Sequence, residues 1–156
     1  MLKPPFSYGK PVVNTGFGYA TSRSGPPETG FLSPAGPGGG QIVDFWSQFF
    51  HYKMPALGRF IKPHVNGEHA RDEAWQASKL VETPQTLDAA GVHGAFVHQF
   101  VSQINPYSDD PRYDLDMAST GLVKYYEGGR RGTAYPDMPW EPKESFRAVA
   151  EYHRNH

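Results

Sequence analysis

The sequence predicts an α/β fold, in which helices alternate with parallel strands and long loops rich in glycine and proline connect them. An amphipathic helix beginning near Glu68 is followed by Gly91 and by a mostly apolar run over residues 92–101. Helix, turn and buried strand in this order are typical of α/β barrels and doubly wound folds. Glycine (17) and proline (15) make up about a fifth of the 156 residues, against an average of roughly 12%. Because aromatic residues are also abundant, at 14%, structured loops explain this composition better than disorder does.

The first expected element is a short buried strand over residues 10–15 (KPVVNT), which is apolar and β-branched with a proline near its start. It ends at residues 16–18 (GFG), where the backbone must turn or approach another segment closely. Residues 21–40 then form a Pro/Gly/Ser-rich stretch without periodicity. We interpret this stretch as a flexible loop within a single domain that spans residues 1–156.

The next apolar segment, residues 41–50, fits two interpretations. Its apolar residues follow a helical stripe, whereas Ile42 and Val43 favour a strand. Residues 51–67 are expected to be loop. The segment also carries an aromatic cluster that either stacks on sugar rings or covers an open edge of the fold; its members are Phe45, Trp46, Phe49, Phe50 and Tyr52. Both pairs of alternatives stay open at this point.

The main helix is predicted from apolar residues at three- and four-residue spacing: Ala70, Ala74, Ala77, Leu80 and Val81. Acidic residues in its first turns, Glu68, Asp72 and Glu73, favour the positive end of the helix dipole whether or not they touch a ligand. Pro84 should kink or break the helix, since it cannot donate a backbone hydrogen bond. A second piece then carries Leu87, and Gly91 supplies the C-terminal stop.

Residues 92–101 are predicted to form a strand covered on both faces, as in a parallel sheet. The following forty residues or so are expected to be mostly loop, with a short strand at residues 122–126. A last helix is expected to open at Glu141-Pro142. Its predicted core face carries Phe146, Val149, Ala150 and His153.

Charge and composition exclude several classes of function. The net charge is -1, and only Arg130 and Arg131 are adjacent basic residues, so we expect no nucleic-acid partner. Without cysteine, no disulfide or thiolate metal site is possible. The first residues have no apolar core of a signal peptide, and the longest apolar run is far shorter than the ~20 residues of a membrane span. The sequence therefore predicts a cytoplasmic protein with no membrane partner.

No cofactor or metal is expected from the motifs. Residues 36–40 (GPGGG) lack the Lys-Ser/Thr of a phosphate-binding loop, so a flexible linker is the better interpretation. The seven histidines include no HExxH pattern, and His64 and His69 are five positions apart across a turn. His98, beside Gln99 in the predicted strand, is a candidate ligand-binding residue at a barrel mouth. A histidine with ordinary core or surface partners is the favoured alternative.

The acidic stretch over residues 109–116 is the segment whose residue types most suggest a ligand-binding site. Asp110, Asp114 and Asp116 are candidate ligand-binding residues, because Asp114 and Asp116 on one face suit a hard cation or a polar ligand. The alternative is loop architecture, in which the aspartates cap turns and Arg112 pairs with one of them. We favour the structural alternative, since the spacing lacks the glycine and terminal glutamate of an EF-hand.

Four stretches resemble a bacterial family of barrel proteins, similar to glycoside hydrolases and often labelled abortive infection proteins: GEHARDEAWQA (67–77), GVHGAF (91–96), DPRYDLDMASTGLVK (110–124) and GTAYPDMPWEPKESF (132–146). The resemblance covers residues 10–154. It implies a partial (βα)8-barrel-like unit, comprising the seventh strand, a helix, the eighth strand and a closing helix. A complete barrel needs about 250 residues, so this chain is an incomplete barrel-like domain.

The same resemblance implies that the chain is catalytically inactive alone. The family's seventh strand has a P-V-V-x-T-E-F-G pattern, and its glutamate position is Gly16 in this sequence. The acid partner of that glutamate is expected upstream of Met1. Because glycosidases need two carboxyl groups, one substituted and one missing carboxylate imply a pseudoenzyme, a remnant or fragment of a barrel.

Three hypotheses follow. Unpaired strand edges favour association, so we expect a homo-oligomer or a complementing upstream chain. A second hypothesis is a carbohydrate-binding module that uses Trp46, Trp140 and the acidic stretch. In a third, enzymatic hypothesis, a partner chain supplies the missing strands and the acid. The variant Gly16→Glu then restores the glutamate in the reconstituted barrel.

Overall fold

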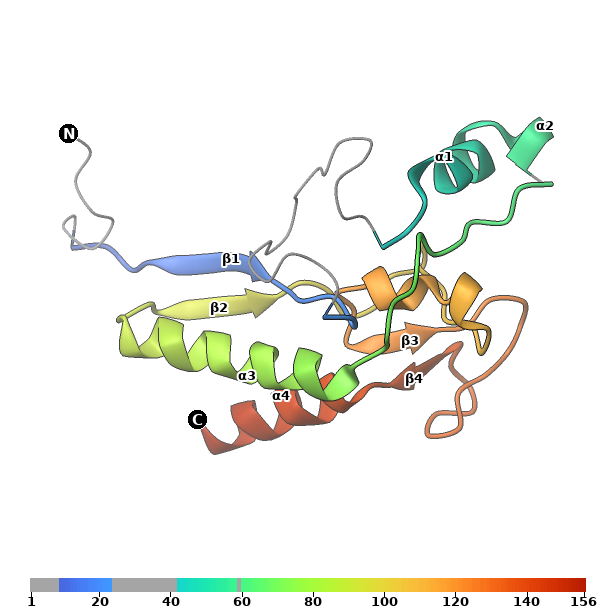
Figure 1. Ribbon diagram of the computed structural model, residues 1–156. Helices are drawn as coiled ribbons and strands as arrows, with labels where there is room; N and C mark the ends of the chain where they lie inside the picture. The colour runs from blue at the N-terminus through green and yellow to red at the C-terminus, as the bar shows by residue number, and fades with distance from the viewer. Residues whose placement is uncertain (1–8, 24–41, 59) are drawn as a thin grey trace, which may run out of the picture.

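The computed structural model describes residues 9–23, 42–58 and 60–156 (Figure 1). Its fold is mixed α/β, as the sequence predicts, and the strands of the described residues form two separate two-stranded sheets rather than a closed barrel. The elements in chain order are β1 (Val13–Phe17), α1 (Phe45–Lys53), α2 (Pro55–Gly58), α3 (Glu73–Ala89), β2 (Gly94–Val97), the 3-10 helices η2 (Pro111–Tyr113) and η3 (Leu115–Ala118), β3 (Val123–Tyr125), β4 (Trp140–Pro142) and α4 (Glu144–Asn155).

Strands β1 and β2 pair in parallel, with α3 on the path between them (Figure 1). The predicted order of helix, glycine and strand is confirmed, and Gly91 ends the helix at φ 78°. The expected burial is wrong. β1 begins at Val13 instead of residue 10, β2 is shorter than residues 92–101, and Val13 and Phe96 are 45% and 63% exposed. Two strands alone cannot cover both faces of a sheet, so apolar side chains stay in contact with solvent.

Helix α3 starts at Glu73 because the Asp72 side chain accepts a hydrogen bond from the Trp75 backbone nitrogen at 2.7 Å, which caps the helix five residues later than predicted. The predicted break at Pro84 is wrong, since the helix continues through it to Ala89. Packing of α3 against α4 and β2 outweighs the lost backbone hydrogen bond. The buried face is also displaced, because Ala70 and Ala74 are exposed and Gln76, Ala77 and Leu80 are buried.

The C-terminal region forms a second, antiparallel sheet before the last helix. The strand expected at residues 122–126 is confirmed as β3, and its partner is β4. Trp140–Pro142 is therefore strand, and the prediction that Glu141 opens the helix is wrong; α4 begins at Glu144. Phe146 and Val149 are half-buried, as expected for a core face, but Ala150 and His153 are exposed.

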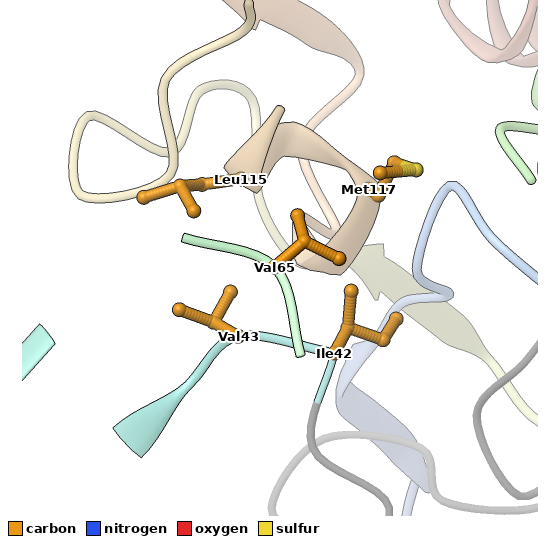
Figure 2. Close-up of a cluster of buried hydrophobic side chains, with 5 residues drawn as sticks. All are labelled: Ile42, Val43, Val65, Leu115 and Met117. Atoms are coloured by element: carbon orange, nitrogen blue, oxygen red, sulfur yellow. The ribbon is translucent and has the colours of Figure 1, made fainter. Parts of the chain in front are cut away.

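A small hydrophobic cluster joins the segment before α1 to the acidic stretch. Val43 forms an isolated antiparallel bridge with Val65. The side chains of these two residues and of Ile42 pack with Leu115 and Met117 (Figure 2). The Asp44 side chain then caps α1 by accepting from the Ser47 nitrogen at 2.7 Å. Both interpretations of residues 41–50 are thus partly correct. Residues 51–53 and 55–58 are helical in α1 and α2 instead of loop.

Two sequence expectations fall largely outside the described residues. The flexible loop at residues 21–40 is described only up to Arg23, and the glycine-rich residues 36–40 are not described at all. In the described segments, no helix combines the length and the apolar character that crossing a membrane requires.

Candidate functional site

The strand ends bring Gly16 and His98 together. A Cβ atom placed on Gly16 would lie 3.7 Å from the His98 Cβ, an ordinary contact. His98 donates from its backbone nitrogen to the Phe17 oxygen at 2.7 Å, and its Nδ1 lies 3.5 Å from the Thr120 Oγ1. The Gln99 oxygen accepts from the Leu122 nitrogen at 3.1 Å. His98 and Gln99 therefore follow β2, where they connect it to the segment before β3.

Asp114 and Asp116 do share a cation, but it is a side chain of the protein itself. Arg71 donates from Nη1 to Asp114 Oδ2 at 3.0 Å and from Nη2 to Asp116 Oδ2 at 2.7 Å. Lys143 contacts the same Asp116 Oδ2 at 2.8 Å. The structural interpretation is thus favoured, although the predicted partner Arg112 is wrong. The Arg112 guanidinium lies 5.7 Å from the Tyr113 ring instead.

This ion network is deeply buried. The side chains of Lys143 and Asp116 are 0% and 1% exposed. Lys143 also donates to Thr21 Oγ1 at 2.9 Å, and Glu73 pairs with Arg71 and Lys124 at 2.9 and 3.3 Å. The network therefore joins the ends of β1 and β4 to the starts of α3 and α4. No group of three or more acidic or histidine side chains suited to a metal ion occurs in the described parts of the chain.

Burial and charge oppose each other in this network. Burial raises the pKa of the Asp116 carboxyl and lowers the pKa of the Lys143 ammonium, and the attraction between the two charges counters both shifts. Burial likewise raises the pKa of Asp114, more than Arg71 lowers it. At Arg71, burial alone would lower the pKa, but attraction to Asp116, Asp114 and Glu73 outweighs it and raises the pKa. Arg71 therefore carries a permanent charge at the centre of the network.

Asp110 lies apart from the network, in a pocket of about 300 Å³ that we call the tyrosine pocket after Tyr107, Tyr113 and Tyr126 in its wall. The Asp110 Oδ1 accepts from the Arg112 nitrogen at 3.0 Å and caps η2. The predicted turn-capping role is confirmed for this aspartate. Its position in the pocket wall also leaves its carboxylate within reach of a ligand.

The two candidate tryptophans occupy different elements. Trp46 is 54% exposed on α1 and stacks near Phe50 at a centroid distance of 6.0 Å. Trp140 lies in β4, with Phe100 at 5.3 Å and Tyr135 at 4.9 Å. The side chains of Phe45 and Tyr52, which belong to the predicted aromatic cluster, lie outside the described part of the structure. The candidate residues thus occupy five places instead of one site: the strand ends, the ion network, the tyrosine pocket, α1 and β4.

Neither the protein-family models nor the curated proteins contain a match to this chain. The resemblance to glycoside-hydrolase-like barrel proteins therefore stays a prediction.

Sequence reasoning missed Lys143 and Tyr107. Lys143 looks like a surface residue next to a proline, and nothing local indicates that it meets Asp116. Tyr107 faces three cationic groups, Arg71, Lys124 and Arg130, at 5.0 to 5.6 Å from its ring centroid. The abundance of tyrosine in loop segments is the one signal that pointed toward such a site.

Proposed function

We propose that this chain is a catalytically inactive, glycoside-hydrolase-like barrel segment that functions by associating with further strands, from a second copy or from a complementing chain. The observation that carries the proposal is the exposed parallel pair β1–β2. Phe96 is more than half exposed in the middle of β2, and Val13 is nearly half exposed in β1. A parallel pair with a crossover helix is normally covered on both faces. Additional strands would bury these residues.

The strand ends support the non-catalytic part of the proposal. Position 16, where the resembling family has glutamate, carries no side chain and faces His98. Glycoside hydrolysis requires a pair of carboxyl groups across the scissile bond. Asp114 and Asp116, the buried acids among the described residues, are engaged by Arg71 and Lys143. These two carboxylates therefore have a structural role.

Light scattering during size exclusion, over a series of protein concentrations, tests association. We expect the wild type to self-associate, and Phe96→Ser to shift the equilibrium toward monomer. Phe60→Ser is the matched control, because Phe60 is 78% exposed but lies outside the sheet. If the wild type is monomeric at every concentration and melts cooperatively, self-association is wrong. The proposal would then require association with a complementing chain, and co-purification with an upstream barrel segment tests that form.

A second candidate, carbohydrate binding, is favoured by the aromatic group at Trp140. Phe100 and Tyr135, both 45% exposed, flank Trp140. Aromatic rings of this kind offer large rigid surfaces for an apolar ligand face. Retention of soluble oligosaccharides on immobilised protein tests it. Loss of retention in Trp140→Ala, but not in Trp46→Ala, would assign binding to this group, and absence of retention in the wild type would exclude it.

A further inference from the structure

The tyrosine pocket is lined by tyrosine rings and by charged side chains, and we call the charged side chains its rim: Lys62, Asp109, Asp110, Glu127 and Arg130. Tyr126 is buried, and the Tyr107 and Tyr126 rings meet edge to face at 5.7 Å. Charged side chains at the rim are solvent-exposed. The volume of about 300 Å³ is at the lower end of the range for small-molecule sites. The pocket therefore suits a ligand of amino-acid size.

Part of the rim charge is already satisfied. Arg130 donates from Nη1 to Asp109 Oδ2 at 2.7 Å, and its guanidinium lies 4.3 Å from the Tyr126 ring centroid. The Arg130 guanidinium also lies 5.6 Å from the Tyr107 ring centroid. This pair holds two of the tyrosine rings in place and has little charge left to offer a ligand.

Three other charges at the rim have no ionic partner within the described residues. The Lys62 ammonium lies 3.9 Å from the Tyr113 ring centroid and makes no ion pair there. The Glu127 carboxylate makes none either, and Asp110 accepts only from a backbone nitrogen. Unlike charges thus line one pocket without neutralising each other. A ligand that presents both signs of charge would satisfy all three.

We infer that the tyrosine pocket binds a small zwitterion, with a free ammonium and a free carboxylate as in an amino acid. Lys62 would receive the carboxylate, and Asp110 and Glu127 the ammonium. The tyrosine rings suit an apolar side chain of the ligand, because aromatic rings bury apolar surface. A neutral sugar would leave the three charges unpaired. This inference is independent of the proposed barrel association.

Titration of the full chain with L-phenylalanine, followed by two-dimensional amide NMR, tests the inference. We expect saturable shifts around Tyr107, Tyr113 and Tyr126, with a dissociation constant near the millimolar range. Phenylalaninamide lacks the carboxylate and N-acetylphenylalanine lacks the ammonium. Each derivative should bind at least about tenfold more weakly, since each loses a charge-assisted hydrogen bond.

Variants at the exposed rim separate recognition from folding. Lys62→Gln and Glu127→Gln should each weaken L-phenylalanine binding about tenfold, and Lys62→Arg should restore it. Lys79→Gln is the control, because Lys79 pairs with Glu82 on α3, outside the pocket. Equal binding of the three ligands would overturn the inference, as would no binding at about 10 mM or a neutral sugar producing the same shifts. Light scattering on the same samples measures self-association independently, so failure of ligand binding and failure of the proposed association can be told apart.

Discussion

Lys143 Nζ and Asp116 Oδ2 lie 2.8 Å apart in the interior of the protein, with both side chains almost completely removed from solvent. Lys143 directly precedes α4, and Asp116 belongs to η3. Isolated charges are costly to bury, so Lys143 depends on Asp116, and Asp116 depends on both Lys143 and Arg71. The pair therefore holds the last helix against the acidic stretch.

Substitution Lys143→Met should destabilise the protein by about 3–5 kcal/mol, because it leaves the Asp116 carboxylate buried with one cation fewer. Urea unfolding followed by circular dichroism measures the change. Lys79→Met is the control, and should change stability much less because its ion pair with Glu82 is exposed to solvent. A Lys143→Met variant as stable as wild type would show that the pair is not buried in solution.

Arg71→Lys should destabilise the protein by about 1–3 kcal/mol. A lysine ammonium cannot reproduce the two guanidinium nitrogens that contact Asp114 and Asp116 separately. Arg112→Lys is the matched control within the acidic stretch itself, and should change stability by less than about 0.5 kcal/mol. Thermal melts of the two variants decide between Arg71 and Arg112 as the partner of these aspartates. A larger loss for Arg112→Lys would contradict the network described above.

The contribution of Glu73 to stability should depend on pH. Burial alone would raise its pKa, but Arg71, Lys124 and the Glu144 backbone nitrogen together hold the pKa below the ordinary value of 4.5. Between the two values the unfolded state binds more protons, so the stabilisation is complete above pH ~4.5 and is lost as pH falls through the folded-state pKa.

Comparison with Glu73→Gln isolates this effect. The wild type should exceed the variant by about 1–2 kcal/mol at pH 7, and the difference should shrink progressively below pH ~4.5. Urea unfolding at a series of pH values measures both curves. A difference that grows on acidification would have the wrong sign and would contradict the ion pairs of Glu73.

Two neighbouring glycines should respond differently to alanine. At Gly16 a Cβ atom meets only His98 at 3.7 Å, so Gly16→Ala should change stability by less than about 1 kcal/mol. At Gly18 it would lie 2.2 Å from the His98 oxygen and 2.9 Å from the Thr120 Cβ, so Gly18→Ala should cost about 2 kcal/mol or more. Thermal melts of both variants check the close packing at the strand ends. Similar effects at the two positions would contradict it.

Gly16→Glu should fold but remain inactive. A Cβ atom at position 16 makes only an ordinary contact with His98, yet a nucleophile without its acid partner gives no ordinary glycosidase. Hydrolysis of an activated aryl glycoside should therefore stay at background in the isolated chain. Hydrolysis above the wild-type level would show that a second carboxyl group of this chain reaches the strand ends.

Local signals in the sequence predicted what local interactions determine. Asp72 and Gly91 bound α3 through a side-chain cap and a left-handed backbone, and both residue types have known positional preferences. Pro84 shows the limit of such reasoning. Its effect depends on whether α4 and β2 hold the helix together, and no local pattern contains that information.

The acidic stretch shows the same division. The sequence placed Asp114 and Asp116 on one face as one alternative, and favoured a loop in which aspartates cap turns and an arginine pairs with one of them. It selected Arg112, which is adjacent, and missed Arg71, which is 43 residues from Asp114. The zwitterion pocket and the buried lysine likewise depend on contacts between distant segments. Spacing alone cannot predict such contacts.

The hydrogen bond between Lys143 and Thr21 spans 122 residues of the chain. Both partners are buried, and this bond can form only when the segment after β1 and the residue that precedes α4 have come together. Contacts of such large sequence separation slow folding, because the loop between them must close first. The N-terminal strand is therefore expected to acquire its final protection from hydrogen exchange only when synthesis has passed α4, and the two ends of the domain should unfold as one cooperative unit.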